Sequence, residues 1–342
     1  MSVDMRPIGT SGFQLPALGF GAAPLGNLYR AISDADARAT LDTALDLGLH
    51  YIDTAPHYGL GLSERRVGDA VRGRKATVST KVGRILFPAP DADTGAERYG
   101  FHTPMPFEAR FDYSHDGILR SHEASLQRLG LARIDILYIH DIGRLTHGEA
   151  HAQYWEQLTK GGGLRALQRL RDEGAVRAVG AGVNEIPVCL ELLDHAPLDI
   201  ILLAGRYTLL EQGALDDLFP TCARAGTAVV IGGPYNSGLL AGGSAPARHY
   251  NYAPPPVEVL NNAQRIAAVC ARHGVPLGAA ALQFAMAHPA VASVIPGLAS
   301  AKEVQETMDR VAFDIPADLW AELRHEALLA PNAPTPAPKV AA

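Results

Sequence analysis

The chain has 342 residues, of which 47% are hydrophobic, and a formal net charge of −6. This length allows two ordinary domains or one large α/β barrel, and the apolar fraction excludes a globally disordered chain. The acidic balance gives no reason to expect nucleic acid as a partner. We expect a cytoplasmic protein outside the membrane, because no run of about 18 apolar residues and no signal-like N-terminus occurs.

Short runs rich in Val and Ile alternate along the chain with longer segments of helical spacing. The predicted strands are residues 15–26, 50–55, 76–83, 133–141, 175–184, 198–205, 227–234 and 290–297. The predicted helices are residues 33–48, 63–72, 115–130, 163–174, 185–195, 214–226, 257–274, 277–288 and 300–311. The strands are continuous apolar runs, which is typical of a parallel sheet covered on both faces.

Short segments at both ends of the chain complete this pattern. Met5–Ile8 and Phe13–Leu15 flank the turn sequence GTSG and predict a β-hairpin that closes one end of the fold. Residues 331–342 are rich in Pro and Ala and predict a flexible tail. We therefore expect a single domain over residues 1–330.

Two folds use such strand–helix units, the closed (β/α)8 TIM barrel and the open, doubly wound sheet. The open sheet requires a glycine fingerprint after its first strand, but GFGAAPLG has Pro24 where the third glycine belongs. Eight units without that fingerprint favour the α/β TIM barrel. Three long insertions, 84–114, 142–160 and 234–256, follow strands and therefore form loops on the C-terminal face, where barrels build their sites.

Four ionisable residues stand near three neighbouring strand ends. Asp53 ends the strand of residues 50–55 and Tyr58 follows it, while Lys81 and His140 end the next two strands. Adjacent parallel strands lie about 4.8 Å apart, so these side chains can converge. Taken singly, Asp53 also suits a turn and His140 a packed core, but a buried lysine without a partner is costly.

Together, the four side chains suit proton transfer between an alcohol and a carbonyl group. A phenol has a pKa near 10, and a neighbouring ammonium group lowers it. A carboxylate keeps the lysine charged, and a histidine can hold the substrate oxygen. None of these groups accepts a hydride, so the chemistry requires a nicotinamide cofactor.

The segment YIDTAPHYGLGLSERRVGDAV (51–71), with STKVG and RLGLARIDILYIHD, resembles the signatures of the aldo-keto reductase family. The resemblance covers nearly the whole chain and implies a (β/α)8 barrel that binds NAD(P)(H) across its C-terminal face. It implies that Tyr58 is the general acid and base, tuned by Lys81 and Asp53. It also implies that His140 is the fourth catalytic residue.

Three further segments, LLAGRYTLLEQ, GGPYNSGLLAGG and HYNYAPPP, resemble the NAD(P)-dependent aldose 1-dehydrogenase branch, which includes L-fucose (D-threo-aldose), L-galactose and pyridoxal dehydrogenases. This resemblance implies hydride transfer from the anomeric carbon of an aldose to NAD(P)+, which gives a lactone. Pyridoxal 4-dehydrogenase and a general aldehyde or ketone reductase remain alternatives. The expected partner is a small sugar or aldehyde, and the oligomeric state stays open.

The family pattern also implies a set of cofactor contacts. These are Gly21, Asp53, Asn184, Gly233, Pro234, Asn236, Gly238, Leu240, Gly297, Glu303 and Thr307. Three positions depart from the commonest pattern, with Val183 in place of a serine, Ala204 in place of a glutamine and Gly232-Gly233 in place of an aromatic residue. Glu303 favours NAD because a carboxylate repels the 2′-phosphate of NADP, which stays the alternative because Lys302 is adjacent.

The insertions supply the remaining candidates. Besides Tyr58 and His140, the expected substrate contacts are Arg84, Phe111, Tyr113 and Trp155, although these four side chains equally suit packing of the loops on the barrel. The HGEAH segment (147–151) has the spacing of a zinc site. It lies in an insertion and is not HExxH, so we expect no metal.

Two rival functions use the same residues. In the first, Lys81 is a Schiff-base nucleophile, as in barrel aldolases. In the second, the chain is a cofactor-sensing regulatory subunit that binds nicotinamide without turnover. Such a subunit would lack part of the Asp53, Tyr58, Lys81 and His140 set, which is intact here.

Overall fold

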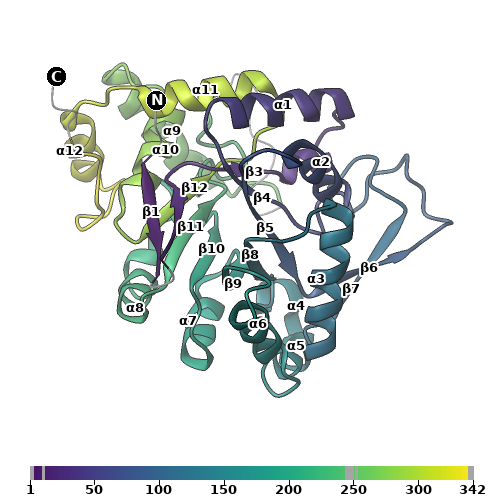
Figure 1. Cartoon of the computed structure of the whole chain (residues 1–342). Coiled ribbons are helices and arrows are strands. Elements are labelled where there is room, and N and C mark those ends of the chain that lie inside the picture. Colours follow the sequence, from purple (N-terminus) through teal and green to yellow (C-terminus); the bar gives the residue numbers. More distant parts are fainter. Residues whose placement is uncertain (1–3, 10–11, 243–249, 251–252, 338–342) are drawn as a thin grey trace.

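The barrel consists of eight parallel strands in a single sheet (Figure 1). The computed structural model describes residues 4–9, 12–242, 250 and 253–337. The strands, in their order around the sheet, are β3 (Phe20–Gly21), β4 (Tyr51–Asp53), β5 (Thr77–Val82), β8 (Ile136–His140), β9 (Ala178–Val183), β10 (Ile200–Ala204), β11 (Ala228–Gly232) and β12 (Val291–Ile295). The strands are neighbours in the order in which they occur in the sequence, as a barrel requires and a doubly wound sheet does not.

The first and last strands meet and close the sheet. Parallel bridges join Leu18 to Val294 and Gly21 to Gly297, and the Gly19 amide donates to the Val294 carbonyl at 2.9 Å. A Cβ at Gly19 would lie 2.8 Å from the backbone oxygen of Tyr51, so the close approach of β3 to its neighbours requires glycine there. The predicted (β/α)8 barrel is therefore confirmed.

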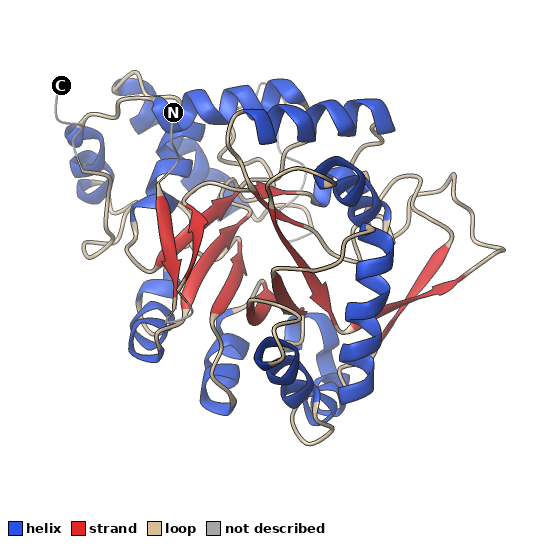
Figure 2. Cartoon of the chain, in the orientation of Figure 1, coloured by secondary structure: helices blue, strands red, loops and turns tan. Residues whose placement is uncertain are grey.

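Helices surround the strands (Figure 2). They are α1 (Asp34–Asp46), α2 (Leu62–Val71), α3 (His115–Leu129), α6 (Gly163–Asp172), α7 (Ile186–His195), α8 (Leu218–Ala225), α9 (Val257–Arg272), α10 (Leu277–Ala287) and α11 (Ala301–Ala312). Ser33 caps α1, because its side chain accepts from the Asp36 amide. None of the described helices has the length and apolar character needed to cross a membrane.

The N-terminal end of the barrel is closed by a hairpin of β1 (Met5–Ile8) and β2 (Phe13–Pro16), which pair antiparallel. Ile8, Phe13 and Leu15 are buried in one cluster with inward-facing side chains such as Tyr51 and Tyr138. The predicted hairpin is confirmed, although residues 10 and 11 of its turn lie outside the described residues.

The insertions contain secondary structure that the sequence reading did not predict. Residues 84–114 form an antiparallel pair, β6 (Arg84–Pro88) with β7 (Phe107–Phe111), which projects from the barrel (Figure 2). Residues 142–160 include α4 (Arg144–His147) and α5 (His151–Leu158). In the third insertion, residues 243–249 and 251–252 are not described, and they include three positions of the HYNYAPPP segment, residues 249, 251 and 252.

The C-terminal segment also differs from the expected pattern. An additional helix, α12 (Ala317–His325), follows α11. The segment predicted as a flexible tail begins in contact with it, because Arg324 donates to the Ala333 carbonyl at 2.9 Å and Ala333 is buried. Residues 338–342 lie outside the described residues.

Candidate active site

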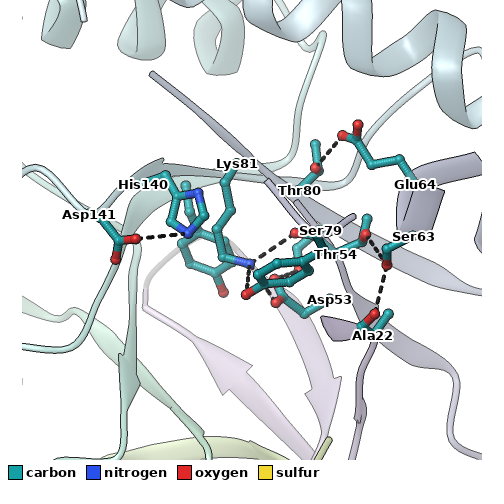
Figure 3. A network of polar contacts seen from close by, with 12 residues as sticks. Ala22, Asp53, Thr54, Ser63, Glu64, Ser79, Thr80, Lys81, His140 and Asp141 are labelled. Carbon is teal, nitrogen blue, oxygen red and sulfur yellow. Dashed lines mark hydrogen bonds and ion pairs between the residues drawn. The ribbon is translucent and has the colours of Figure 1, made fainter. Parts of the chain in front are cut away.

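The structure brings the four predicted catalytic residues together at the C-terminal end of the barrel, and Figure 3 shows Asp53, Lys81 and His140 among them. Lys81 Nζ lies 2.6 Å from Asp53 Oδ2 and 3.2 Å from the Tyr58 hydroxyl. The rings of Tyr58 and His140 are perpendicular, with centroids 6.1 Å apart. The convergence of these side chains follows from the parallel register, in which β4, β5 and β8 end side by side.

The loop that carries Tyr58 is fixed at both ends. Thr54 and Ser63 share a hydroxyl hydrogen bond of 2.8 Å, and Ser63 donates to the Ala22 carbonyl at 2.7 Å (Figure 3). Gly26 lies so close that a Cβ there would be 2.5 Å from the carbonyl carbon of Tyr58. The loop is therefore held against the end of β3, and the phenol has a fixed position relative to Lys81.

Lys81 uses all of its hydrogen-bond donors within the site. An ammonium group has three N–H bonds, and those of Lys81 reach Asp53 Oδ2, the Thr54 carbonyl and the Tyr58 oxygen. Tyr58 therefore accepts from Lys81, which favours the phenolate. The phenol's own hydrogen is left to point elsewhere, into the cleft beside it.

Burial nevertheless raises the pKa of Tyr58 well above the ordinary value of a phenol, and the Asp53 and Asp141 carboxylates add to this while Arg84 opposes it. This direction is opposite to the lowering that we expected from Lys81, because loss of water around the phenolate outweighs the neighbouring cation. The protein alone therefore holds Tyr58 as a neutral phenol, the form that donates a proton. Oxidation uses the phenolate, and a bound oxidised nicotinamide ring, which carries a positive charge, would favour that form.

His140 is held as a neutral imidazole. Burial lowers its pKa well below the ordinary value, with further lowering by Arg84, Lys81 and His57. Its Nε2 lies 3.3 Å from Asp141 Oδ2, while its buried Nδ1 has no hydrogen-bond partner among the described residues. A neutral imidazole can hold a substrate oxygen without adding charge to the site.

A cleft of about 1310 Å³ opens beside these groups. Small-molecule sites usually measure ~300–1,000 Å³, so the cleft has room for a dinucleotide and a small substrate together. Of the predicted site residues, Tyr58, Lys81, Arg84, His140 and Asn184 line it. Its size and its mixture of charged, amide and aromatic side chains fit a nicotinamide nucleotide.

The sequence reading missed several residues of the cleft wall. They include Tyr29, Arg30, His57, Tyr99, Phe101, His102, Asp141, Leu145, Thr146 and Ser237. His57 lies inside the signature segment and Asp141 directly follows His140, so their positions beside strand ends were available as a signal. Tyr99 and Phe101 had no such signal, because they come from the middle of an insertion.

Backbone strain is concentrated around the cleft. Tyr29, Tyr99, Asp141 and Ser237 line it and have positive φ angles of 62°, 56°, 46° and 57°. Each such non-glycine conformation costs about 1–3 kcal/mol and persists where the surroundings enforce it, often at functional sites. This strain independently marks the cleft as the functional part of the molecule.

The predicted substrate contacts divide into two groups. Arg84 faces the cleft, where it donates to Asp141 at 2.7 Å. Phe111, Tyr113 and Trp155 are not among the described residues that line the cleft. Tyr113 is fully buried and donates to the backbone oxygen of His140 at 2.7 Å, so it supports the end of β8 from behind.

The other two side chains pack the insertions on the barrel. Phe111 lies under the Arg84 guanidinium, 4.8 Å from ring to carbon, and Trp155 packs against the rings of His151 and His195. The sequence placed these aromatic residues in the insertions and left substrate contact and loop packing equally open. Their side chains turn away from the cleft because the insertion folds into β6–β7 and α4–α5 instead of an open loop.

The predicted cofactor contacts also divide. Asn184 lines the cleft, as do the departing positions Val183 and Ala204. Leu240 and Thr307 have no exposed surface, so neither side chain can contact a ligand in this structure. Thr307 instead donates to the Glu303 backbone oxygen at 2.8 Å.

The remaining predicted cofactor residues have structural partners of their own. Asp53 is 2% exposed and bound to Lys81, and Gly21 and Gly297 form the bridge that closes the barrel.

Asn236 accepts from Thr208 and donates to the Gly205 carbonyl. Gly233 and Gly238 take positive φ angles in the turn after β11, which also contains Pro234. Their contact with the cofactor stays a prediction.

The HGEAH segment does not assemble a metal site. His147 Nε2 lies 3.0 Å from the Tyr113 hydroxyl, and His151 Nδ1 lies 3.1 Å from the Ile142 carbonyl. Glu149 is exposed. Within the described part of the chain, no group of three or more His, Cys, Asp and Glu side chains is placed to hold a metal ion.

Known proteins with similar sequences and structures belong to one family. Residues 17–326 match the aldo/keto reductase family. The chain is 42% identical to D-threo-aldose 1-dehydrogenase from a Pseudomonas species, over 98% of this chain and 100% of that protein. It is 41% identical to pyridoxal 4-dehydrogenase from Microbacterium luteolum, over 95% and 98%. L-galactose dehydrogenase from Arabidopsis thaliana is 29% identical over 90% and 88%.

Solved structures agree. The holo form of an aldo-keto reductase from Bacillus halodurans aligns with a TM-score of 0.73 and 27% identity, over 96% of this chain and 97% of that one. The chain thus belongs to the aldo/keto reductase family, and its relatives confirm the resemblance to the aldose dehydrogenase branch. It is an oxidoreductase of that family, which uses a nicotinamide nucleotide as cofactor.

Proposed function

We propose that the protein is an aldose 1-dehydrogenase, which oxidises the anomeric carbon of an L-fucose or D-threo-aldose type sugar to the lactone and passes the hydride to NAD(P)+. The observation that carries this proposal is the contact of the Tyr58 hydroxyl with Lys81 Nζ at 3.2 Å, at the wall of a cleft large enough for cofactor and sugar. The relative named D-threo-aldose 1-dehydrogenase, at 42% identity, supports this substrate class.

Each catalytic residue then has one role. Tyr58, as the phenolate, accepts the proton of the anomeric hydroxyl, and Lys81 stabilises that phenolate by donating to its oxygen. Asp53 keeps Lys81 charged and aimed, since their contact is 2.6 Å and both are 2% exposed. His140, held neutral, binds the sugar oxygen and fixes the ring relative to Tyr58.

The cleft wall supports a polyhydroxylated substrate. On one side Arg84 and Asp141 form an ion pair of 2.7 Å, and a pair of this kind offers donors and acceptors to vicinal hydroxyl groups. On another, Phe101 packs against the rings of His57 and Tyr58 and gives the wall an apolar part. A sugar has both a polar edge and an apolar face, and this combination suits it.

Oxidation of pyridoxal is the second candidate, because the relative with that name is 41% identical and the aromatic side chains of Tyr99 and Phe101 suit a planar ring. General aldehyde or ketone reduction uses the same residues in reverse. The regulatory alternative is disfavoured by the intact tetrad. The Schiff-base alternative is disfavoured because Lys81 is 2% exposed and engages three acceptors.

NAD is the proposed cofactor, and NADP is the alternative. The carboxylate of Glu303 accepts from the Ala299 amide at 2.7 Å and from Arg30 at 3.0 Å. Arg30 lines the cleft, and Glu303 neutralises a cation that would otherwise attract a 2′-phosphate. We also propose that the partner is a small sugar or aldehyde and that the protein acts in the cytoplasm.

An oxidation screen tests the proposal. The purified protein is mixed with L-fucose, D-arabinose, L-galactose or pyridoxal and with NAD+ or NADP+, and reduced nicotinamide is followed by absorbance. With NAD+ as cofactor, we expect the kcat/KM for an aldose to be higher than the kcat/KM for pyridoxal. Turnover of pyridoxal alone would replace the proposal by its second candidate. Cofactor binding without any turnover would establish the regulatory alternative.

A further inference from the structure

A chain of hydroxyl groups runs from the barrel interior to Asp53. The Tyr138 and Tyr51 hydroxyls lie 3.0 Å apart, Ser79 Oγ lies 3.2 Å from the Tyr51 hydroxyl, and Ser79 donates to Asp53 Oδ1 at 2.7 Å. Tyr51, Ser79 and Tyr138 are all fully buried. Their strands are β4, β5 and β8, the same ones that carry Asp53, Lys81 and His140.

The number of hydrogens fixes the direction of this chain. Each hydroxyl has a single hydrogen, and an ionised carboxylate only accepts. Ser79 is placed to donate either to Asp53 Oδ1 at 2.7 Å or to the Tyr51 hydroxyl at 3.2 Å. The ionised carboxylate is the nearer and stronger acceptor, so it takes the single Ser79 hydrogen, and Ser79 then accepts from Tyr51. Tyr51 has then used its hydrogen and must accept from Tyr138. The hydrogen bonds all point toward Asp53, and aligned bonds of this kind strengthen one another in a low-dielectric interior.

The surroundings make the chain strong. Ile136, Ile200, Leu202 and Val230 belong to the same buried cluster as the two tyrosines. Each carboxylate oxygen of Asp53 thus has its own partner, with Oδ2 on Lys81 and Oδ1 on Ser79. The chain draws part of the negative charge of Asp53 toward the barrel interior and away from Tyr58.

We propose that Tyr138, Tyr51 and Ser79 are positioning residues that act through Asp53 to favour the phenolate form of Tyr58, which accepts the proton during oxidation. This inference rests on the proposed function, because it concerns the same proton transfer. Without the chain, more of the Asp53 charge would repel the Tyr58 phenolate, and Asp53 would compete more strongly for Lys81. Burial already raises the pKa of Asp53 against the opposing effect of Lys81 and Ser79.

Other titratable groups face Tyr58 and are left in place by the proposed variants. They are Asp53 from β4, Lys81 from β5, Arg84 from β6, His140 and Asp141 from the end of β8, and His57 from the loop of Tyr58 itself. Asp53 interacts with Lys81 and with the hydroxyls of Tyr58, Ser79, Tyr51 and Tyr138, of which the variants remove only the last three. A change in pH profile on removal of a chain hydroxyl can therefore be assigned to the chain.

The first experiment measures the pH dependence of kcat for oxidation in Ser79→Ala, Tyr51→Phe and Tyr138→Phe. Oxidation requires the Tyr58 phenolate, so its rate rises with pH. Loss of a chain donor should move that rise to higher pH, by about half a pH unit for Tyr51→Phe, or about threefold in rate on the rising limb. The shift should decrease from Ser79 through Tyr51 to Tyr138. Unchanged profiles in all three variants would overturn the proposal.

The second experiment tests whether the groups act in series. Because Tyr138 reaches Asp53 only through Tyr51, the double variant Tyr51→Phe/Tyr138→Phe should have the same pH profile as Tyr51→Phe alone. Independent residues would instead give additive shifts, and additivity would refute the chain. Cofactor affinity, measured by fluorescence titration, should be the same in the single and double variants.

Tyr207→Phe is the matched control. Tyr207 is fully buried, and its hydroxyl has no hydrogen-bond partner among the described residues, so this variant also removes a buried phenol oxygen. It should leave the pH profile unchanged, and an equal shift would show a general effect of buried tyrosines. If wild type oxidises neither sugars nor pyridoxal, the proposed function fails. If it does and Tyr51→Phe has the wild-type profile, only the chain fails.

Discussion

The N-terminal end of the barrel is filled by Ile8, Phe13 and Leu15 of the hairpin, whereas the C-terminal end opens into a charged cleft. At the first end, polar side chains complete the backbone hydrogen bonds of the strands. Asp135 accepts from the Val78 amide at 3.0 Å, and Arg6 donates to the carbonyls of Met286 and Val291.

At the second end, polar side chains bind one another and the cleft. Lys81 joins Asp53 to Tyr58, while His140 Nδ1 stays without a partner in the described part of the chain. The same strands thus supply both ends, and the difference lies in what their polar groups satisfy. At one end the partners are backbone groups that stabilise the fold, and at the other they are groups that act on a ligand.

The largest expected effect is a loss of kcat on changing one residue at the C-terminal end of the barrel. Tyr58→Phe should reduce kcat by about 10³-fold or more, because it removes the only group proposed to move the proton. Nicotinamide binding, measured by fluorescence titration, should stay within about twofold of wild type, since the phenol oxygen acts on substrate. Retained turnover would refute the role of Tyr58.

The opposite end should respond in stability instead of activity. Leu15→Ala removes a fully buried side chain of the hairpin and should lower the free energy of unfolding by about 2–5 kcal/mol. Denaturant melts measure this loss. The kcat/KM per folded molecule should be that of wild type, and a parallel loss of activity would show that the two ends are coupled.

The rate of oxidation at the C-terminal cleft should depend steeply on pH. Burial and the two carboxylates raise the pKa of Tyr58, so the reactive phenolate is the minor form at neutral pH. The oxidation rate should therefore rise about tenfold per pH unit into the alkaline range, while reduction, which uses the neutral phenol, should decline at high pH. A flat oxidation profile between neutral and alkaline pH would contradict a phenolate base.

Asp141→Asn tests how the charged wall of the cleft affects substrate binding and the pKa of Tyr58. It removes the partner of Arg84 and should raise the KM for an aldose about fivefold, equivalent to about 1 kcal/mol for one hydrogen bond. The Asp141 charge also raises the pKa of Tyr58. Its loss should shift the oxidation profile to lower pH, opposite to Tyr51→Phe. A shift in the same direction as Tyr51→Phe would exclude this electrostatic account.

The smallest effect is expected at Trp155, for which the sequence left substrate contact and loop packing equally open. Trp155 packs on His151 and His195 behind the insertion, so Trp155→Phe should change the KM for substrate by less than about twofold. Steady-state kinetics with the best aldose checks this. A larger change in KM with unaltered thermal stability would restore Trp155 as a substrate contact.

Much of the fold was predictable because it depends on local patterns. Apolar runs, helical spacing and caps such as Ser33 gave the order of strands and helices, and the absence of a glycine fingerprint distinguished the barrel from the open sheet. The positions of Asp53, Lys81 and His140 at strand ends followed from that order. Parallel strands bring their ends together whatever the connecting loops do.

The sequence by itself thus determined the barrel and the convergence of the catalytic side chains, since both depend on strand order and residue type. Only the tertiary structure decided that Tyr113 and Trp155 pack away from the cleft, that His57, Phe101 and Asp141 form the cleft wall, and that Leu240 is buried. These outcomes depend on how long insertions fold against one another. Such contacts join residues far apart in the chain, where hydrophobicity and spacing do not show which face of a loop meets the cleft.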